Sequence, residues 1–316
     1  MDCYSKVMSA QKQTKRGSEF KNHIADYIFF TYICNMNIHK YILTRFNLTL
    51  WQTDKNSNNT QTSEWLEQRF RLFEQFTLPS VLNQTDKNFK WIVLFSSETP
   101  IKYKSRIDEI RSRCPQFRAI GVAPGQSAIF GQIFKEVIEN DLGDKAEGIV
   151  STTYLDNDDA LSVHYMEMIH NLISTNYREI VAQPAIINFR FGCQYFTEHK
   201  VASKASYKRN HFITLAEPLG SNSIKTVFGY GSHYYIGKHN GINKIISTKP
   251  AMWLEVIHEK NVINDVRMSL HTRITGSEML LRTFGVTAKT SDNTFSSLLK
   301  LFKMKIRQKI KMLAMR

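Results

Sequence analysis

The stretch Gly148-Ile149-Val150-Ser151-Thr152-Thr153-Tyr154-Leu155 runs directly into Asp156-Asn157-Asp158-Asp159. Its first eight residues carry no charge and are rich in β-branched and aromatic side chains, which predicts a buried strand. The next four residues hold three carboxylates. Because ligands in open α/β sheets bind beyond the carboxyl ends of the strands, this junction predicts both a sheet and a binding site.

Strands and helices alternate along the chain around this junction. Strands are expected at residues 41–48, 89–96 and 117–122, and helices from 65 to near Pro79 and at 102–113, 128–139 and 160–175. The continuous apolar run at 89–96 is typical of a strand that is covered on both faces of a parallel sheet. The alternation predicts right-handed βαβ units in an α/β fold with a doubly wound sheet.

The pattern is less regular after residue 180. Strands are expected at 179–191 and 226–236, a polar, basic loop at 198–211, and a short helix or turn at 250–258. We expect these residues to form a mixed extension of the same sheet. The predicted organisation is an N-terminal extension (1–39), one large domain (40–290, with halves at about 40–175 and 176–290) and a basic tail (291–316).

The net charge of +14 is concentrated at the two ends of the chain. Residues 295–316 hold seven Lys or Arg and no acidic residue, residues 1–23 add three charges, and the remainder is about +4. A nucleic-acid enzyme more often spreads its basic residues over a groove, so we expect no nucleic-acid partner. The four cysteines lack paired spacing, which argues against a zinc site or disulfide framework and favours a reducing, cytoplasmic compartment.

No apolar run reaches the roughly 18 residues needed to span a bilayer. The apolar stretch at 27–36 is too short, and it is interpreted as a signal-like, docking or non-core segment.

The acidic cluster can be interpreted in two ways. Three carboxylates within four residues repel one another and require a partner when buried, and a divalent cation such as Mg²⁺ or Mn²⁺ supplies one. In extended backbone the side chains of Asp156 and Asp158 point the same way, so a metal there could bridge the diphosphate of a nucleotide-sugar. Alternatively, Asp159 caps the following helix. The residues alone leave both interpretations open.

Several segments together resemble the putative rhamnosyltransferase family of GT-A-type glycosyltransferases over about residues 40–270. They are Tyr41-Ile42-Leu43-Thr44-Arg45-Phe46-Asn47, Trp65-Leu66-Glu67-Gln68-Arg69-Phe70-Arg71-Leu72-Phe73, Thr77-Leu78-Pro79-Ser80-Val81, Trp91-Ile92-Val93-Leu94-Phe95-Ser96, Thr152-Thr153-Tyr154-Leu155-Asp156-Asn157-Asp158-Asp159-Ala160-Leu161 and Met252-Trp253-Leu254-Glu255-Val256-Ile257-His258. The resemblance implies a GT-A (Rossmann-like) three-layer α/β/α sandwich with a mostly parallel central sheet. It also implies a Mg²⁺ or Mn²⁺ site that holds a nucleotide-sugar, such as dTDP-rhamnose, and a glycan or lipid-linked acceptor.

The resemblance also assigns roles to single residues. Asp156 would face the nucleoside, Asp158 would ligate the metal, Asp159 would be a further ligand or the cap, and His258 would complete the metal set. Asn157 is grouped with the nucleotide-binding residues.

Other site residues are assigned by position and chemistry. Arg45 and Asn47 follow the first strand and are expected to contact the base or diphosphate. An inverting transfer needs a proton acceptor, for which Glu217, Glu255 and Asp265 are the candidates. No Glu-Asp dipeptide, which many inverting GT-A enzymes have, occurs in the chain. A non-catalytic sugar- or nucleotide-binding protein is therefore the alternative hypothesis.

The tail predicts a basic amphipathic helix. Apolar residues recur at helical spacing (Leu298, Leu299, Phe302, Ile306, Ile310 and Leu313), with Lys300, Lys303, Arg307 and Lys311 opposite them. Such a helix could lie on an anionic membrane surface, which would make the protein peripheral at the inner face of the membrane. A solvated tail or a helix packed on the domain is the alternative.

Overall fold

The computed structural model describes residues 37–50, 53, 59–144, 146–220, 223–231, 233–236, 238–248, 251–258, 266–267, 272–291 and 293–314. Most of the expected N-terminal extension, including the apolar stretch at 27–36, lies outside the described residues, and so does Asp265. No helix in the described ranges is long and apolar enough to cross a membrane.

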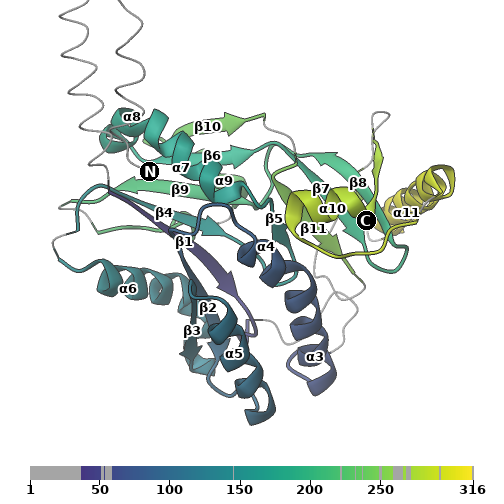
Figure 1. Ribbon diagram of the computed structural model, residues 1–316, viewed down its shortest axis with the longest axis horizontal. Coiled ribbons are helices and arrows are strands. Elements are labelled where there is room, and N and C mark those ends of the chain that lie inside the picture. Colours follow the sequence, from purple (N-terminus) through teal and green to yellow (C-terminus); the bar gives the residue numbers. More distant parts are fainter. Residues whose placement is uncertain are drawn as a thin grey trace, which may run out of the picture.

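A seven-stranded sheet forms the centre of the molecule (Figure 1), with the strand order β10-β6-β9-β4-β1-β2-β3. Its strands are β1 (Ile38–Arg45), β2 (Lys90–Ser96), β3 (Phe117–Val122), β4 (Ile149–Tyr154), β6 (Ala185–Phe189), β9 (Ile213–Pro218) and β10 (Asn243–Ser247). β3, β2, β1 and β4 are parallel, and β9 alone runs antiparallel to its neighbours β4 and β6. The expected mostly parallel sheet is therefore confirmed.

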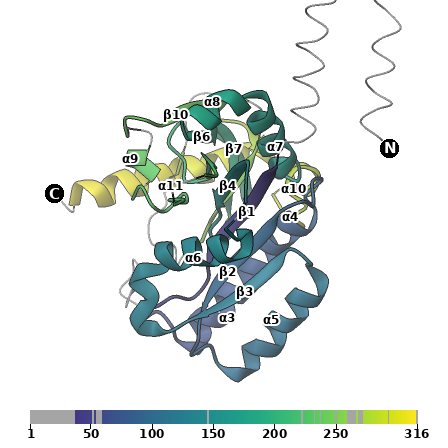
Figure 2. The same cartoon turned by 90° about the vertical axis from the view of Figure 1, so that its left-hand side faces the viewer.

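Helices cover both faces of this sheet, as the α/β/α sandwich requires. One apolar cluster joins the sheet to α3 (Ser63–Leu72), α5 (Ile101–Arg113), α7 (Tyr165–Thr175) and α8 (Tyr177–Ala182). A second cluster, on the other face, contains Phe134 and Ile138 of α6 (Phe130–Leu142), which follows the 3₁₀ turn η3 (Pro124–Ile129). Figure 2 shows α5 and α6 on opposite sides of β2 and β3.

The helix predicted from residue 65 to near Pro79 is longer than expected. A π-helical turn, η2 (Phe73–Thr77), joins α3 to α4 (Leu78–Leu82), so the helical segment passes the expected end near Pro79. Pro79 lies in the first turn of α4, where its missing N–H is tolerated.

A five-stranded second sheet packs beside the first, with the order β12-β8-β7-β11-β5. Its strands are β5 (Ala160–Leu161), β7 (Phe191–Phe196), β8 (Val201–Ser206), β11 (Trp253–Ile257) and β12 (Ile274–Thr275), and it is flanked by α10 (Ser277–Phe284) and α11 (Thr294–Ala314). Residues 176–290 thus do more than extend the first sheet. The domain limits drawn from the sequence stay a prediction.

The expected helix at 160–175 is wrong at its start. Ala160 and Leu161 pair antiparallel with β11, and α7 begins only at Tyr165 with His164 in the capping position. Pairing satisfies the backbone groups that a helix would otherwise satisfy. Asp159 therefore does not cap a helix, and that interpretation is excluded.

Three further expectations are wrong in the second half. Residues 250–258 contain β11 rather than a helix or turn, and β8 lies inside the expected loop at 198–211. The expected strand at 226–236 is a series of turns followed by the short helix α9 (His233–Ile236). Thr226 there has a φ of 64°, and its carbonyl accepts a hydrogen bond from Gly229, which turns the chain out of any strand.

Trp253 fixes β11 against the rest of the fold. Its ring stacks on Phe212 with centroids 5.3 Å apart, and its Nε1 donates to the Phe189 carbonyl at 2.8 Å. Gly192 on β7 lies directly against the ring, because a Cβ built there would meet Trp253 Cδ2 at 2.0 Å. The second sheet thus depends on the absence of a side chain at this position.

Gly192→Ala is expected to lower the free energy of unfolding by about 1–3 kcal/mol, because Trp253 must leave its rotamer or the strands must separate. Gly125→Ala is the matched control, since nothing lies within 4 Å of its Cβ position. Urea denaturation measures both. Equal stabilities of the two variants would contradict this packing.

Candidate active site

The Asp156–Asp159 segment connects the two sheets. It leaves the carboxyl end of β4 and enters β5, so it lies where the central sheet meets the second one. The side chain of Asn157 fastens it to the end of β1, because Nδ2 donates to the carbonyls of Arg45 (3.1 Å) and Phe46 (2.5 Å). The three carboxylates are therefore held on a fixed loop at the edge where α/β sheets bind ligands.

Asn157 and Asn47 belong to the scaffold of this site. Asn157 Oδ1 accepts from Arg69, so both ends of its side chain bind protein. Asn47 is 2% exposed, and its amide bridges Ser96 N and Thr99 Oγ1 at 3.0 Å each, which joins the ends of β1 and β2. These contacts correct the expectation that the two amides face the nucleotide.

Asp158 is buried and neutralised by protein groups. Its Oδ2 lies 2.7 Å from Arg69 Nη1 and 2.9 Å from His258 Nε2. Burial opposes the charged form, but the charge of Arg69 and the hydrogen bond from His258 hold the pKa of Asp158 well below its usual range. Asp158 and His258, both predicted to ligate a metal, lie in contact, and Arg69 already supplies a counter-charge to Asp158.

A second group, Asp156, Asp159 and His211, has the composition of a metal site. One ligand atom from each lies within 4.8 Å of the other two. His211 Nε2 is 2.8 Å from Asp159 Oδ2 and 3.8 Å from Asp156 Oδ2. The Asp156 side chain is 35% exposed and that of His211 16%, so a ligand can reach this group from solvent. Carboxylate oxygens with one imidazole suit Mn²⁺ as well as Mg²⁺.

The charges of this group are strongly coupled. Burial, with the neighbouring carboxylates, raises the pKa of Asp159, whose other oxygen accepts from Val256 N at 2.8 Å. Burial alone would lower the pKa of His211, but the hydrogen bond to Asp159 and the charges of Asp159 and Asp156 raise it to about 9. His211 is therefore the group that compensates the negative charge at Asp159, and a cation bound beside these carboxylates would do the same.

Arg45 and Tyr154 connect Asp156 to a small pocket. Arg45 Nη2 donates to the Tyr154 hydroxyl at 2.6 Å, and that hydroxyl donates to Asp156. The guanidinium carbon of Arg45 lies 4.7 Å from the ring centre of Phe130 and 5.7 Å from that of Phe228. Arg45 Nε is buried and makes no hydrogen bond within the described part of the chain.

This pocket holds about 290 Å³ and is lined by Arg45, Phe130, Tyr154, Ile213, Val227, Phe228 and Gly231. Aromatic walls beside a guanidinium suit a flat base joined to a phosphate. Arg45, which was expected to contact the base or diphosphate of the donor, lines such a pocket.

The three candidate bases have different positions. Glu217 pairs with Val150 of β4. Val150 comes four residues before Tyr154, so Glu217 lies about 13 Å along the strand from the carboxyl end of β4. Its carboxylate accepts from Lys225 N and Thr226 N, and burial raises its pKa. Glu217 as the catalytic base stays a prediction from the sequence, and its position is remote from the acidic group.

Glu255 precedes Val256 on β11, and Val256 N binds Asp159 at 2.8 Å, so the backbone of Glu255 lies beside the acidic group. It is 4% exposed, and its Oε2 accepts from Gln194 Nε2 at 2.7 Å and lies 3.4 Å from Arg267 Nε. Asp265 is outside the described residues.

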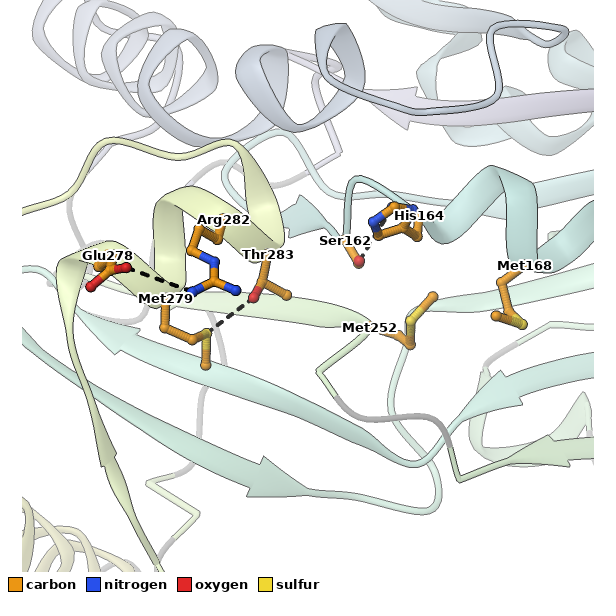
Figure 3. Close-up of a pocket in the computed structure, with 8 residues that line it drawn as sticks. All are labelled: Ser162, His164, Met168, Met252, Glu278, Met279, Arg282 and Thr283. Carbon is orange, nitrogen blue, oxygen red and sulfur yellow. Dashed lines mark hydrogen bonds and ion pairs between the residues drawn. The ribbon is translucent and has the colours of Figure 1, made fainter.

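A larger cavity of about 600 Å³ lies elsewhere, between α10 and the start of α7 (Figure 3). Its lining consists of Ser162, His164, Met168, Met252, Glu278, Met279, Arg282 and Thr283. Met252 comes four residues before Val256, the residue that binds Asp159, so about 13 Å of strand separates the cavity wall from the acidic group. Glu278 and Arg282 pair at 3.6 Å. The cavity is therefore separate from the candidate active site.

Two residues of the site were not expected from the sequence. Arg69 follows Trp65 by four positions and precedes Phe73 by four, so it lies on the apolar stripe of its helix. A charge on such a stripe indicates a buried partner, and this signal could have been used. His211 had no comparable signal, because it lies at the end of a segment that was interpreted as a loop.

The family of the chain follows from a sequence comparison. The family described as "Putative rhamnosyl transferase" matches residues 30–270, and the chain belongs to it. This membership confirms the resemblance and places the chain among glycosyltransferases. No significant match was found among curated protein sequences.

Solved structures show only distant similarity. The S. aureus TarS structure aligns with 69% of this chain and 37% of its own, at 8% identity and a TM-score of 0.38. The structure of S. aureus TarS 1–349 in complex with UDP aligns with 69% of this chain and 60% of its own, at 10% identity and a TM-score of 0.39. The structure of 4-diphosphocytidyl-2C-methyl-D-erythritol synthase aligns with 67% of this chain and 90% of its own, at 12% identity and a TM-score of 0.30. The chain thus spans less than two thirds of the TarS chains it matches.

Arg69→Gln is expected to lower the free energy of unfolding by about 3 kcal/mol, because it leaves a buried carboxylate without its main counter-charge. Arg71→Gln, on the exposed side of the same helix, is the control. Adding Asp158→Asn to Arg69→Gln should restore part of the loss. Thermal and urea unfolding measure these differences, and equal effects of Arg69→Gln and Arg71→Gln would count against the assigned pairing.

Proposed function

We propose that the protein transfers a sugar from a nucleotide-diphosphate sugar to a glycan or lipid-linked acceptor. The observation that carries this proposal is the continuous arrangement of Arg45, Tyr154, Asp156, Asp159 and His211 at the carboxyl ends of β1 and β4, in a chain of this family. The family description favours rhamnose, with dTDP-rhamnose as the donor. We further propose that the reaction takes place at the cytoplasmic face of a membrane.

In this proposal the donor lies across the end of β1. The base occupies the pocket lined by Phe130 and Phe228, whose rings contact each other, and the partly exposed guanidinium of Arg45 donates to the diphosphate. Tyr154 holds Arg45 and Asp156 in place through one hydroxyl. Because these groups are fixed before the donor arrives, little ordering is needed on binding.

The donor set fits Mg²⁺ or Mn²⁺. Asp156, Asp159 and His211 would hold the cation, and when bound it would supply positive charge for the leaving nucleoside diphosphate. The alternative set predicted from the sequence, Asp158 with His258, is supported by their 2.9 Å contact. We favour the first set because it is accessible and because Arg69 already neutralises Asp158.

We propose Glu255 as the group that accepts the proton of the acceptor hydroxyl. It is next to Val256, whose N–H binds Asp159, and Gln194 and Arg267 orient its carboxylate. Asp265 stays a second candidate. A non-catalytic nucleotide-sugar or glycan-binding protein is the competing function.

Binding of dTDP is expected to strengthen with Mn²⁺ in the wild type, measured by calorimetric titration. Asp156→Asn and His211→Gln should each weaken this metal-dependent binding by at least about tenfold. The control His164→Gln changes an exposed histidine that pairs with Glu167, and it should bind as the wild type does. If Asp158→Asn abolishes the metal effect while Asp156→Asn keeps it, the metal set is Asp158 with His258.

Glu255→Gln is expected to lower kcat for acceptor-dependent release of nucleoside diphosphate by roughly 10²–10⁴-fold, while donor binding is kept. Glu278→Gln, an exposed change at the separate cavity, is the control. Full activity of Glu255→Gln would remove Glu255 from this role. Absence of acceptor-dependent release in the wild type, across nucleotide-sugars, would favour the binding protein.

A further inference from the structure

Helix α11 has one face buried against the second sheet. Leu301 is 1% exposed and lies in an apolar cluster with Phe196, Val201 and Val266, and Ser297 on the same side is fully buried. The helix is therefore a fixed part of the domain surface and not a solvated tail.

The opposite face of α11 is an exposed apolar stripe. Its members are Phe295, Leu299, Phe302, Ile306 and Ile310, with exposed fractions between 41% and 77%. With 3.6 residues per turn, these five side chains fall within an arc of roughly 80°, which points away from Leu301. Figure 1 shows α11 at the edge of the molecule, and in Figure 2 its C-terminal end projects past the other elements. A continuous apolar row of this length on a surface marks an interaction site.

Positive charges flank this stripe on both sides. Lys303 and Arg307 are exposed along one edge, and Lys309 along the other. Residues 295–316 contain seven Lys or Arg and no acidic residue. An apolar stripe between basic side chains matches the interface of an anionic bilayer, where the apolar row enters the acyl boundary and the cations meet the lipid phosphates.

We propose that α11 binds an anionic lipid surface through this stripe. A second copy of the chain fits less well, because pairing two stripes brings two basic rows within the Debye length of ~8 Å. Residues 1–36 of this chain fit the stripe poorly as well. They hold five basic and three acidic residues, so their net positive charge repels that of α11. A nucleic acid would satisfy the cations but leave the apolar row in water.

The same helix is connected to the candidate active site. Lys305 Nζ donates to the Val266 carbonyl at 2.6 Å, and Val266 N donates to Gln308 Oε1 at 3.2 Å. The next residue, Arg267, pairs with Glu255. Resting on the proposed function, this series of contacts joins the lipid-binding helix to the candidate base, which favours a lipid-linked acceptor over a soluble one.

Co-sedimentation of the full chain with vesicles tests the proposal, using phosphatidylcholine alone and phosphatidylcholine mixed with phosphatidylglycerol. The wild type should bind the anionic vesicles. Phe302→Gln/Ile306→Gln should bind them at least about tenfold more weakly, because apolar area is lost from the interface. Lys303→Gln/Arg307→Gln should show a loss of similar size, because two cations near the surface are lost. All these positions are exposed, so the thermal midpoint should not change.

Matched controls lie on other helices. Ile101→Gln/Ile129→Gln removes two exposed apolar side chains, and Lys102→Gln/Lys104→Gln removes two exposed cations; both should bind as the wild type does. Absence of wild-type binding to anionic vesicles, or unchanged binding by the stripe variant, overturns the proposal. A wild-type dimer in light scattering that the stripe variant converts to a monomer overturns it in favour of a second copy. No donor is present, so the outcome is independent of the glycosyl-transfer proposal.

Discussion

The need to balance three carboxylates at the junction of two sheets governs this structure. Asp156, Asp158 and Asp159 are held on a short loop, and two of them are buried. An isolated carboxylate in such a place would cost several kcal/mol, so each needs a positive or proton-donating partner. The partners come from distant parts of the chain: Arg69 and His258 for Asp158, and His211 with the Val256 amide for Asp159. The acidic loop therefore holds together α3, the loop before β9, and β11.

Only the third carboxylate is left partly open. Asp156 shares the Tyr154 hydroxyl with Arg45 and keeps about a third of its side chain exposed. This division explains how a cluster that must be stabilised for folding can also serve a ligand. Asp158 belongs to the rigid frame, and Asp159 is shared between that frame and the proposed metal site. The exposed Asp156 is joined through Tyr154 to Arg45, which lines the pocket of the proposed donor.

The first half of the fold could be predicted because its signals are local. The parallel strands are apolar runs, and the helices between them show regular spacing, so residues 117–122 were placed correctly and the other strands to within a few residues. The second half depends on pairing between segments far apart in sequence. Ala160 and Leu161 have the composition of a helix start, yet they form a strand because β11 lies beside them. The position of Trp253 also depends on distant residues, because Gly192 and Phe212 contact its ring. Such pairings leave no periodic signal.

The candidate site shows the same division. The acidic motif and Arg45 could be located because they follow predicted strands. His211 could not, because nothing in its own segment indicates that it returns to Asp159. The scaffold contacts of Asn47 and Asn157 could not be foreseen for a related reason: position beyond a strand end does not distinguish a side chain that faces the ligand from one that ties two strands together.

The most direct test of this account is a crystal structure of the protein with Mn²⁺ and dTDP, using anomalous scattering from manganese. The account predicts an anomalous peak bounded by Asp156, Asp159 and His211, with the diphosphate beside Arg45. A peak held by Asp158 and His258 with Arg69 displaced, or a nucleotide bound away from Asp156, would contradict it.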